Sequence, residues 1–172
     1  LVVNASASTG YVTLGPLASA VTVADPTTST TWDLAFTATP TVVVNGGASG
    51  PGGVRAYCLC ANSALSLAQI EGQSASAGAA AFGAVTATDT PADSLFQADA
   101  ASQAISGWYN YDATTHAVAP SGSAWGLRLA STPGSYAKCE GTALTSPGQA
   151  NAGAVTIEWA LQPSATGAMG PD

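Results

Sequence analysis

Short apolar runs follow one another along the chain, and turn residues separate them. Within the runs, apolar residues alternate with small or polar ones, which is typical of strands that bury one face. Gly, Pro, Asn and Asp mark the turns between the runs. The pattern predicts a single antiparallel all-β domain. Strands are expected at 11–14, 20–24, 32–36, 41–44, 54–61, 107–111, 116–118, 124–129, 135–139 and 154–161.

Three stretches depart from this alternation. Residues 92–103 have helical character, 64–70 are expected to form a short helical turn with another strand as the alternative, and the Ala/Ser/Gly-rich stretch 72–90 is expected to be a surface excursion. The chain shows no internal repeat and no domain boundary. We therefore expect one β domain over 1–162 and a flexible tail over 163–172.

Charged side chains are scarce: the chain has 3 Lys and Arg, 10 Asp and Glu and 1 His, with a formal net charge of −7. So few basic residues exclude nucleic-acid binding and electrostatic docking on anionic lipid, because both need cations to meet phosphates. Most catalytic sites are assembled from charged residues and histidines, so the composition favours a binding or structural role over an enzyme. No apolar run approaches the roughly 18 residues of a transmembrane helix.

Three cysteines leave one thiol without a partner. Cys58 and Cys60 are two residues apart and share one face of the expected strand, with Tyr57 and Leu59 on the other. One interpretation is a disulfide between Cys139 and either Cys58 or Cys60 in an oxidising compartment. The alternative is three small buried hydrophobic residues. The spacing does not match a zinc site.

A few residues remain as candidates for chemistry. His116 is the sole imidazole of the chain, and its alternatives are a weak ligand site and an ordinary turn histidine. No credible nucleophile, catalytic residue or metal site is found. Asp33 is expected to brace a turn by accepting from a backbone N–H, with Arg55 or Arg128 as alternative partners.

The aromatic residues Trp108, Tyr109 and Tyr111 alternate between the two faces of one expected strand, so one side of the set is a candidate for contact with a partner protein. The alternative is ordinary core packing, which we expect for Trp125 and Trp159. The Gly-rich run from Asn45 predicts a tight turn with positive φ at several positions. Its structural residues are Asn45, Gly46, Gly47 and Gly50.

Several motifs, in order along nearly the whole chain, resemble the HmuY family of bacterial haem-binding surface proteins. The quoted segments are Val3-Asn-Ala-Ser6, Tyr11-Val-Thr-Leu14, Trp32-Asp-Leu-Ala-Phe36, Asn45-Gly-Gly-Ala-Ser-Gly-Pro-Gly52, Trp108-Tyr-Asn-Tyr-Asp112, Tyr136-Ala-Lys138 and Val155-Thr-Ile157. The resemblance implies an all-β fold in the cell envelope or on the cell surface, often with a lipid anchor.

The best-known members of that family hold haem iron between two histidines, and some relatives use methionines. This chain departs from the pattern at both positions. One ligand of the family lies five residues after the closing-strand Trp, and the corresponding residue here is Ala113. The other comes from the central excursion, and residues 62–107 contain neither His nor Met. The resemblance therefore carries the fold but not the haem ligands.

Together these observations favour a non-catalytic, extracytoplasmic β-scaffold of the periplasm or cell surface. It would act as an accessory subunit that packs against protein subunits of a larger membrane-associated assembly, reached through a partner or a lost lipid anchor. No cofactor is required in this interpretation. The alternative is a haem- or tetrapyrrole-binding protein that uses His116 or an apolar pocket. A third hypothesis, an extracellular carbohydrate hydrolase, lacks a readable carboxylate pair.

Overall fold

Antiparallel strands supply the regular structure of the described chain. The computed structural model describes residues 1–15, 17–37, 41–58, 94, 96–129, 136–145 and 153–161. Within these ranges no α-helix occurs, and the predicted all-β fold is confirmed. No helix in these ranges is long and apolar enough to cross a membrane.

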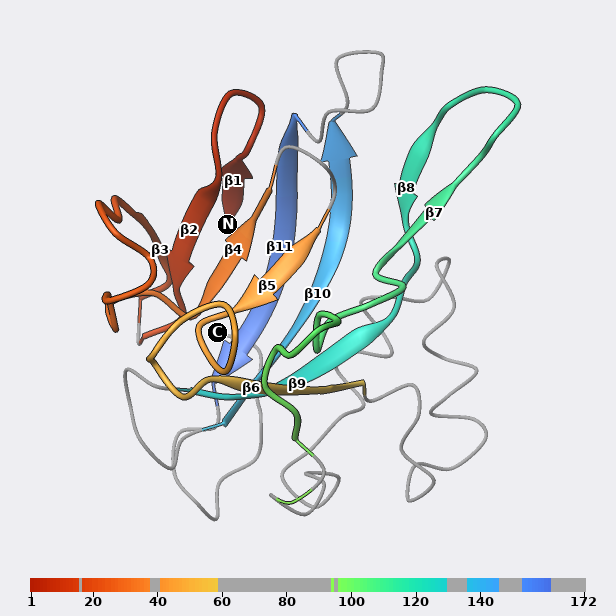
Figure 1. The fold of residues 1–172 in the computed structure, drawn as a ribbon. Helices are drawn as coiled ribbons and strands as arrows, with labels where there is room; N and C mark the ends of the chain where they lie inside the picture. Colours follow the sequence, from red (N-terminus) through yellow and green to blue (C-terminus); the bar gives the residue numbers. More distant parts are fainter. Residues whose placement is uncertain are drawn as a thin grey trace.

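The strands form two sheets and a separate hairpin (Figure 1). The five-stranded sheet has the spatial order β1 (Val2–Asn4), β11 (Ala154–Leu161), β10 (Tyr136–Thr145), β9 (Ala124–Arg128) and β6 (Arg55–Cys58). The four-stranded sheet has the order β3 (Ser19–Val21), β2 (Gly10–Thr13), β4 (Leu34–Phe36) and β5 (Val42–Val44). The hairpin pairs β7 (Tyr109–Tyr111) with β8 (Val118–Pro120).

The hydrophobic core lies between the two sheets. Alternate residues of the four-stranded sheet, such as Val12, Leu34 and Val44, belong to one buried cluster with Leu127 and Val155 of the five-stranded sheet. All five are 0–1% exposed. The period-two alternation in the sequence therefore places one apolar face of each sheet against the other, as in a β-sandwich.

The alternation located most strands well. β11 has the predicted bounds, while β10 extends beyond the predicted 135–139 to Thr145 and includes an irregularity between Gly141 and Ala143. β1 was not predicted, because its three residues are too few to show a period. The expectations for 64–70, 72–90 and the tail 163–172 lie outside the described residues.

The prediction of a helix over 92–103 is wrong for the described residues 96–103. The Gln97 amide and carbonyl bond those of Ala56 at 2.8 Å, which extends the edge of the five-stranded sheet beyond β6. Phe96 is buried, and its ring centroid lies 6.1 Å from that of Tyr57 and 5.4 Å from that of Tyr136. Tertiary pairing and aromatic burial outweigh the local helical tendency here.

Candidate functional site

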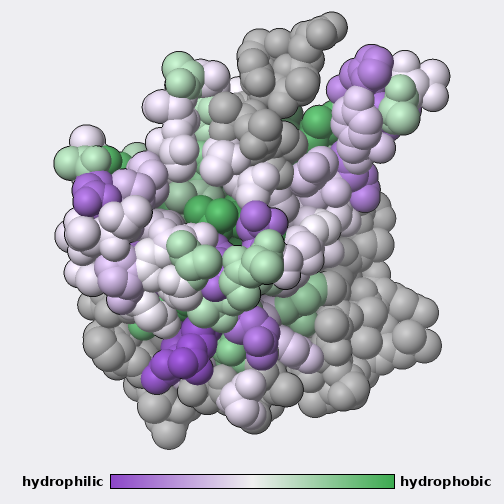
Figure 2. All heavy atoms as spheres, in the orientation of Figure 1, coloured by the Kyte–Doolittle hydropathy of each residue, from purple (hydrophilic) through white to green (hydrophobic). Residues whose placement is uncertain are grey.

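The β7–β8 hairpin is paired with neither sheet, and β8 lies beside β10. Its tip extends away from the body (Figure 1 and Figure 2). Its turn is organised by Asp112, whose Oδ1 accepts the backbone N–H groups of Thr114 at 2.8 Å and Thr115 at 3.2 Å. These hydrogen bonds, the Thr114 one foremost, lower the pKa of the Asp112 carboxyl. The turn is thus held by local hydrogen bonds at an exposed site.

His116 and Tyr111 form an exposed pair near the end of this hairpin. The predicted returning strand at 116–118 starts later, because His116 lies in the turn with φ 57° and the strand begins at Val118. A hydrogen bond of 2.5 Å joins the Tyr111 hydroxyl to His116 Nδ1, and the two ring centroids are 6.0 Å apart. Tyr111 is 53% exposed. The pair presents two aromatic rings to solvent.

The three aromatic residues predicted to contact a partner differ in exposure. Trp108 is buried, so its assignment to a contact surface is wrong: it packs edge-on against Phe36 at 6.2 Å between ring centroids and belongs to the core. Tyr109 is half-buried and packs edge-on against Trp108 at 5.4 Å. The backbone carbonyl of Trp108 also accepts the Ser121 N–H at 2.9 Å, so the base of the hairpin is anchored while Tyr111 is exposed.

The Asn45 loop is closed by one buried side chain. The Asn45 amide donates to the carbonyls of Ser29 at 3.0 Å and Trp32 at 2.8 Å, and its oxygen accepts the Gly52 N–H at 3.0 Å. A Cβ at Gly50 would lie 2.1 Å from this oxygen, so the loop requires glycine there. This arrangement is a structural brace and leaves no polar group of the side chain for a ligand.

The remaining glycines of this turn are needed for two different reasons. A Cβ at Gly46 would lie 2.0 Å from the Val54 carbonyl oxygen, which forbids any side chain. Gly47 has φ 64° and Gly53 has φ 76°, a region that favours glycine. Backbone approach and positive φ therefore both contribute to the turn.

Asp33 is buried and does accept from a backbone N–H, as expected. Its Oδ2 accepts the Leu14 N–H at 2.7 Å and the Thr13 hydroxyl at 3.1 Å. Its own carbonyl accepts the Asn45 N–H at 2.9 Å. The carboxylate ties β2 to the segment before β4, which is a bracing role.

The predicted disulfide to Cys139 is not formed, because Cys139 is a free, buried thiol. Cys58 and Cys139 both lie opposite Trp125, on either side of β9. They are therefore two strand spacings apart, about 9–10 Å, which exceeds the roughly 7 Å that a disulfide can bridge. Cys58 is disulfide-bonded, and Cys60 lies outside the described residues.

Burial keeps the Cys139 thiol protonated. Loss of solvation, with an added contribution from the charge of the neighbouring Glu140, raises its pKa to about 12. A thiolate is the reactive form of cysteine, so this group is inert at neutral pH. Cys139 acts as a small hydrophobic residue of the core.

The face of the five-stranded sheet that points away from the core carries five charged residues, and we call it the charged face. Strand pairing sets Arg55 opposite Arg128, and Glu140 opposite Glu158. Lys138 lies on the same face, two residues before Glu140. The charged face therefore holds all 3 basic residues of the chain. Sequence reasoning missed this grouping, because it depends on strand register.

Glu140 is the least compensated group of the charged face. It is 2% exposed, and neither carboxylate oxygen has a hydrogen-bond partner among the described residues. The pKa of Glu140 is raised to about 7: burial is the main cause, the facing Glu158 adds to the rise, and Lys138 opposes it. Near neutral pH the carboxyl is therefore partly protonated, since the neutral form avoids like-charge repulsion.

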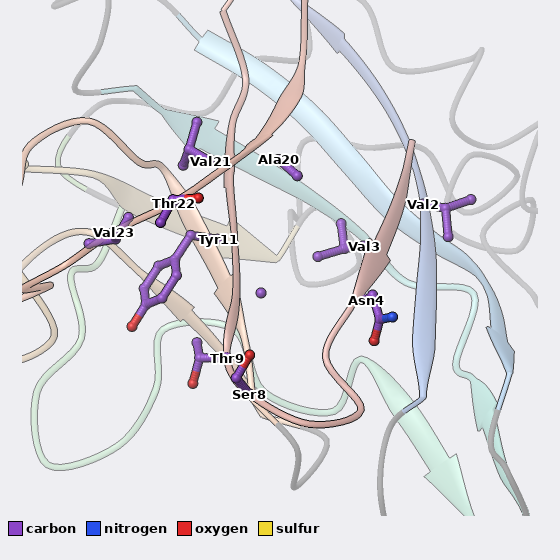
Figure 3. Close-up of a pocket in the computed structure, with 11 residues that line it drawn as sticks. Val2, Val3, Asn4, Ser8, Thr9, Tyr11, Ala20, Val21, Thr22 and Val23 are labelled. Carbon is purple, nitrogen blue, oxygen red and sulfur yellow. The ribbon is translucent and has the colours of Figure 1, made fainter.

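An open hollow of about 650 Å³ lies where the N-terminal strands diverge, between β1 on one side and β2 and β3 on the other (Figure 3). None of its lining residues is charged. The lining comprises Val2, Val3, Asn4, Ser8, Thr9, Gly10, Tyr11, Ala20, Val21, Thr22 and Val23. His116 is not among them, and the hairpin stands on the opposite side of Figure 1 from β3.

Within the described ranges, no three His, Cys, Asp or Glu residues are placed to hold a metal ion. Comparison with known proteins gives no assignment: no family model matches the chain, and no curated protein matches it.

Proposed function

We propose that this chain is a non-catalytic accessory subunit that contacts a protein partner through its β7–β8 hairpin. The observation that carries the proposal is the exposed Tyr111–His116 pair on a hairpin anchored at Trp108. Protein interfaces are enriched in tyrosine and depleted of charge at their centres. A tyrosine held by a hydrogen bond also loses little side-chain freedom when it is buried in a complex.

The proposed host is a membrane-associated assembly on the extracytoplasmic side of a bacterial envelope. The disulfide at Cys58 supports an oxidising compartment. The motif resemblance to the HmuY family supports an envelope location, and membership of that family is part of the proposal. A net charge of −7 makes protein surfaces better partners than anionic lipid headgroups.

The test is co-purification from the membranes of the source organism in mild detergent, with wild type and Tyr111→Ala compared. The variant should lose most of the co-purifying subunits, since tyrosines at interface centres typically contribute about 2 kcal/mol or more. Leu17→Ala is the matched control, because Leu17 is an apolar residue that is 85% exposed outside the hairpin. Equal recovery with Tyr111→Ala and wild type would contradict the proposal.

One observation supports haem binding as the second candidate. His116 Nδ1 is held by Tyr111, while Nε2 makes no hydrogen bond within the described residues, and a held imidazole with one open nitrogen can ligate a metal. A hemin titration followed by absorbance, on wild type and His116→Ala, separates the two functions. The subunit proposal expects no saturable Soret shift. A shift that His116→Ala abolishes would replace it with haem binding.

A further inference from the structure

The outer side of β1 offers backbone groups for another strand. Leu1 exchanges both backbone hydrogen bonds with Ile157, at 3.0 and 2.9 Å, and the Ala5 N–H donates to Gly153 at 2.9 Å. Bonded and non-bonded pairs alternate in an antiparallel ladder, so the N–H and C=O of Val2 and Asn4 point away from β11. No described strand pairs with β1 on that side.

The hollow beside this edge can accommodate side chains of an added strand. Figure 3 shows Val3 directed toward the hollow from β1, with Tyr11 and Thr9 on its other side. A Cβ at Gly10 would come within 2.7 Å of Val3 Cγ1 and 2.8 Å of the Asn4 carbonyl oxygen, so β2 lies close to the edge at Asn4 and the open backbone groups are those of Val2. A volume of about 650 Å³ is within the usual range of binding pockets, roughly 300–1,000 Å³.

We propose that the β1 edge and its hollow bind an extended, uncharged segment of the partner protein as an additional strand. The outward amide and carbonyl of Val2 supply the main-chain hydrogen bonds, and alternate side chains of the segment enter the hollow. This inference rests on the proposed function, because it gives the same partner a second contact away from the hairpin.

The chemistry of the hollow selects the segment. Its lining has methyl groups, hydroxyls, one amide and the Tyr11 ring but no ionic partner, so a charged side chain entering it would lose hydration without compensation. An extended backbone is required, because a helix satisfies its own N–H and C=O groups and cannot pair with β1. The occupant is therefore extended and neutral.

The test uses a short capped peptide of alternating threonine and valine, titrated into the full isotope-labelled chain and followed by amide NMR shifts. Saturable shifts are expected at Val2, Asn4 and Gly10. The same peptide with N-methyl groups on alternate residues cannot pair through its backbone and should not bind. Equal binding of the two peptides, shifts confined to other surfaces, or no binding would each overturn the proposal.

Val2→Pro removes the outward N–H without touching the bonds to β11, since proline is tolerated at a sheet edge that faces solvent. It should weaken peptide binding about tenfold, the typical effect of one lost hydrogen bond. Val2→Ala is the matched control, because it keeps the amide, and the Val2 side chain points away from the hollow in Figure 3. Equal affinity in Val2→Pro and Val2→Ala would overturn the assigned donor.

Two further measurements keep this inference separate from the hairpin proposal. Tyr111→Ala should bind the peptide like wild type, so loss of the partner with retained peptide binding assigns the two contacts independently. Sedimentation of the chain alone tests whether a second copy of the chain pairs with the β1 edge. A concentration-dependent dimer that Val2→Pro abolishes would show pairing with a second copy and overturn the partner-segment proposal.

Discussion

Both faces of the five-stranded sheet contain fully buried side chains, yet the two faces differ in chemistry. Leu127 on the core face is 0% exposed, and so is Lys138 on the charged face. The core face packs against the second sheet, whereas the charged face sets like charges opposite each other across strands. The difference teaches that burial alone does not mark the stabilising side of a sheet, because only complementary neighbours make burial favourable.

The largest change in stability should come from removing a buried side chain from the core face. Leu127→Ala removes a fully buried side chain, and it should lower the free energy of unfolding by about 2–5 kcal/mol. Arg55→Ala on the charged face is the control: the half-buried Arg55 faces Arg128, so its loss should change stability by less than about 1 kcal/mol. Urea unfolding measures both, and similar losses would erase the contrast between the faces.

A stabilising effect is expected on the charged face from Glu140→Gln at pH 8. The substitution keeps the shape and removes a buried negative charge that accepts no hydrogen bond from the described part of the chain. Because the pKa of Glu140 is raised to about 7, ionising it in the folded state costs roughly 1–3 kcal/mol, which the variant recovers. A loss of stability at pH 8 would show that the carboxylate is compensated.

The raised pKa of Glu140 also predicts that the stability of the wild-type protein depends on pH. The folded pKa of about 7 lies above the ordinary 4.5, so between these values the folded state binds more protons than the unfolded state. Wild-type stability should therefore fall as pH rises from about 4.5 to 7, with no further change from this group at higher pH. Glu140→Gln should lose this fall, which thermal unfolding across the pH range would reveal.

A smaller gain should follow from Glu158→Gln. Glu158 lies directly opposite Glu140 and is half-buried, so its neutralisation removes one cross-strand repulsion. The expected gain in stability at pH 8 is about 0.2–1 kcal/mol. Because the substitution lowers the pKa of Glu140, the fall in stability with rising pH should end at a lower pH than in wild type. An unchanged pH profile would exclude repulsion between the two carboxylates as a cause of the raised pKa.

The smallest effect on stability is expected in the hairpin, because Tyr111 belongs to neither the core face nor the charged face. Tyr111→Ala should change the free energy of unfolding by less than about 0.5 kcal/mol, since the ring is 53% exposed. The measurement is the same urea titration. A loss of several kcal/mol would mean that Tyr111 belongs to the folded core, and the co-purification test would need another variant.

The sequence predicts the strands far better than it predicts their neighbours. Alternation over eight residues locates β11, and the Asn45 run predicts its turn, because both signals are local. Register is not local: it sets Cys139 across Trp125 from Cys58 and brings Glu140 opposite Glu158. Neither the missing disulfide nor the charged face could be derived without it.

The candidate site was predicted in part for the same reason. Alternation shows that Trp108 and Tyr109 face opposite ways, but not that Trp108 lies at the anchored base of a hairpin against Phe36. His116 and Tyr111 were singled out separately, and their contact depends on a turn with φ 57° at His116. The hollow beside β1 has no sequence signal, because residues from three strands enclose it.

The brace at Asn45 also bears on chemical ageing. Asn-Gly is the dipeptide whose side-chain amide is lost most readily in flexible peptides, through attack by the following backbone nitrogen. Here the Gly46 N–H is held by the Val44 carbonyl at 2.7 Å, and the Asn45 amide is fixed by its three bonds, so the reaction is blocked while the loop is folded. A chain that unfolds long enough to deamidate would bring a carboxylate against the carbonyls of Ser29 and Trp32. The extent of deamidation at Asn45 would thus record how long each molecule had spent unfolded. The same change would make refolding of the native loop less favourable.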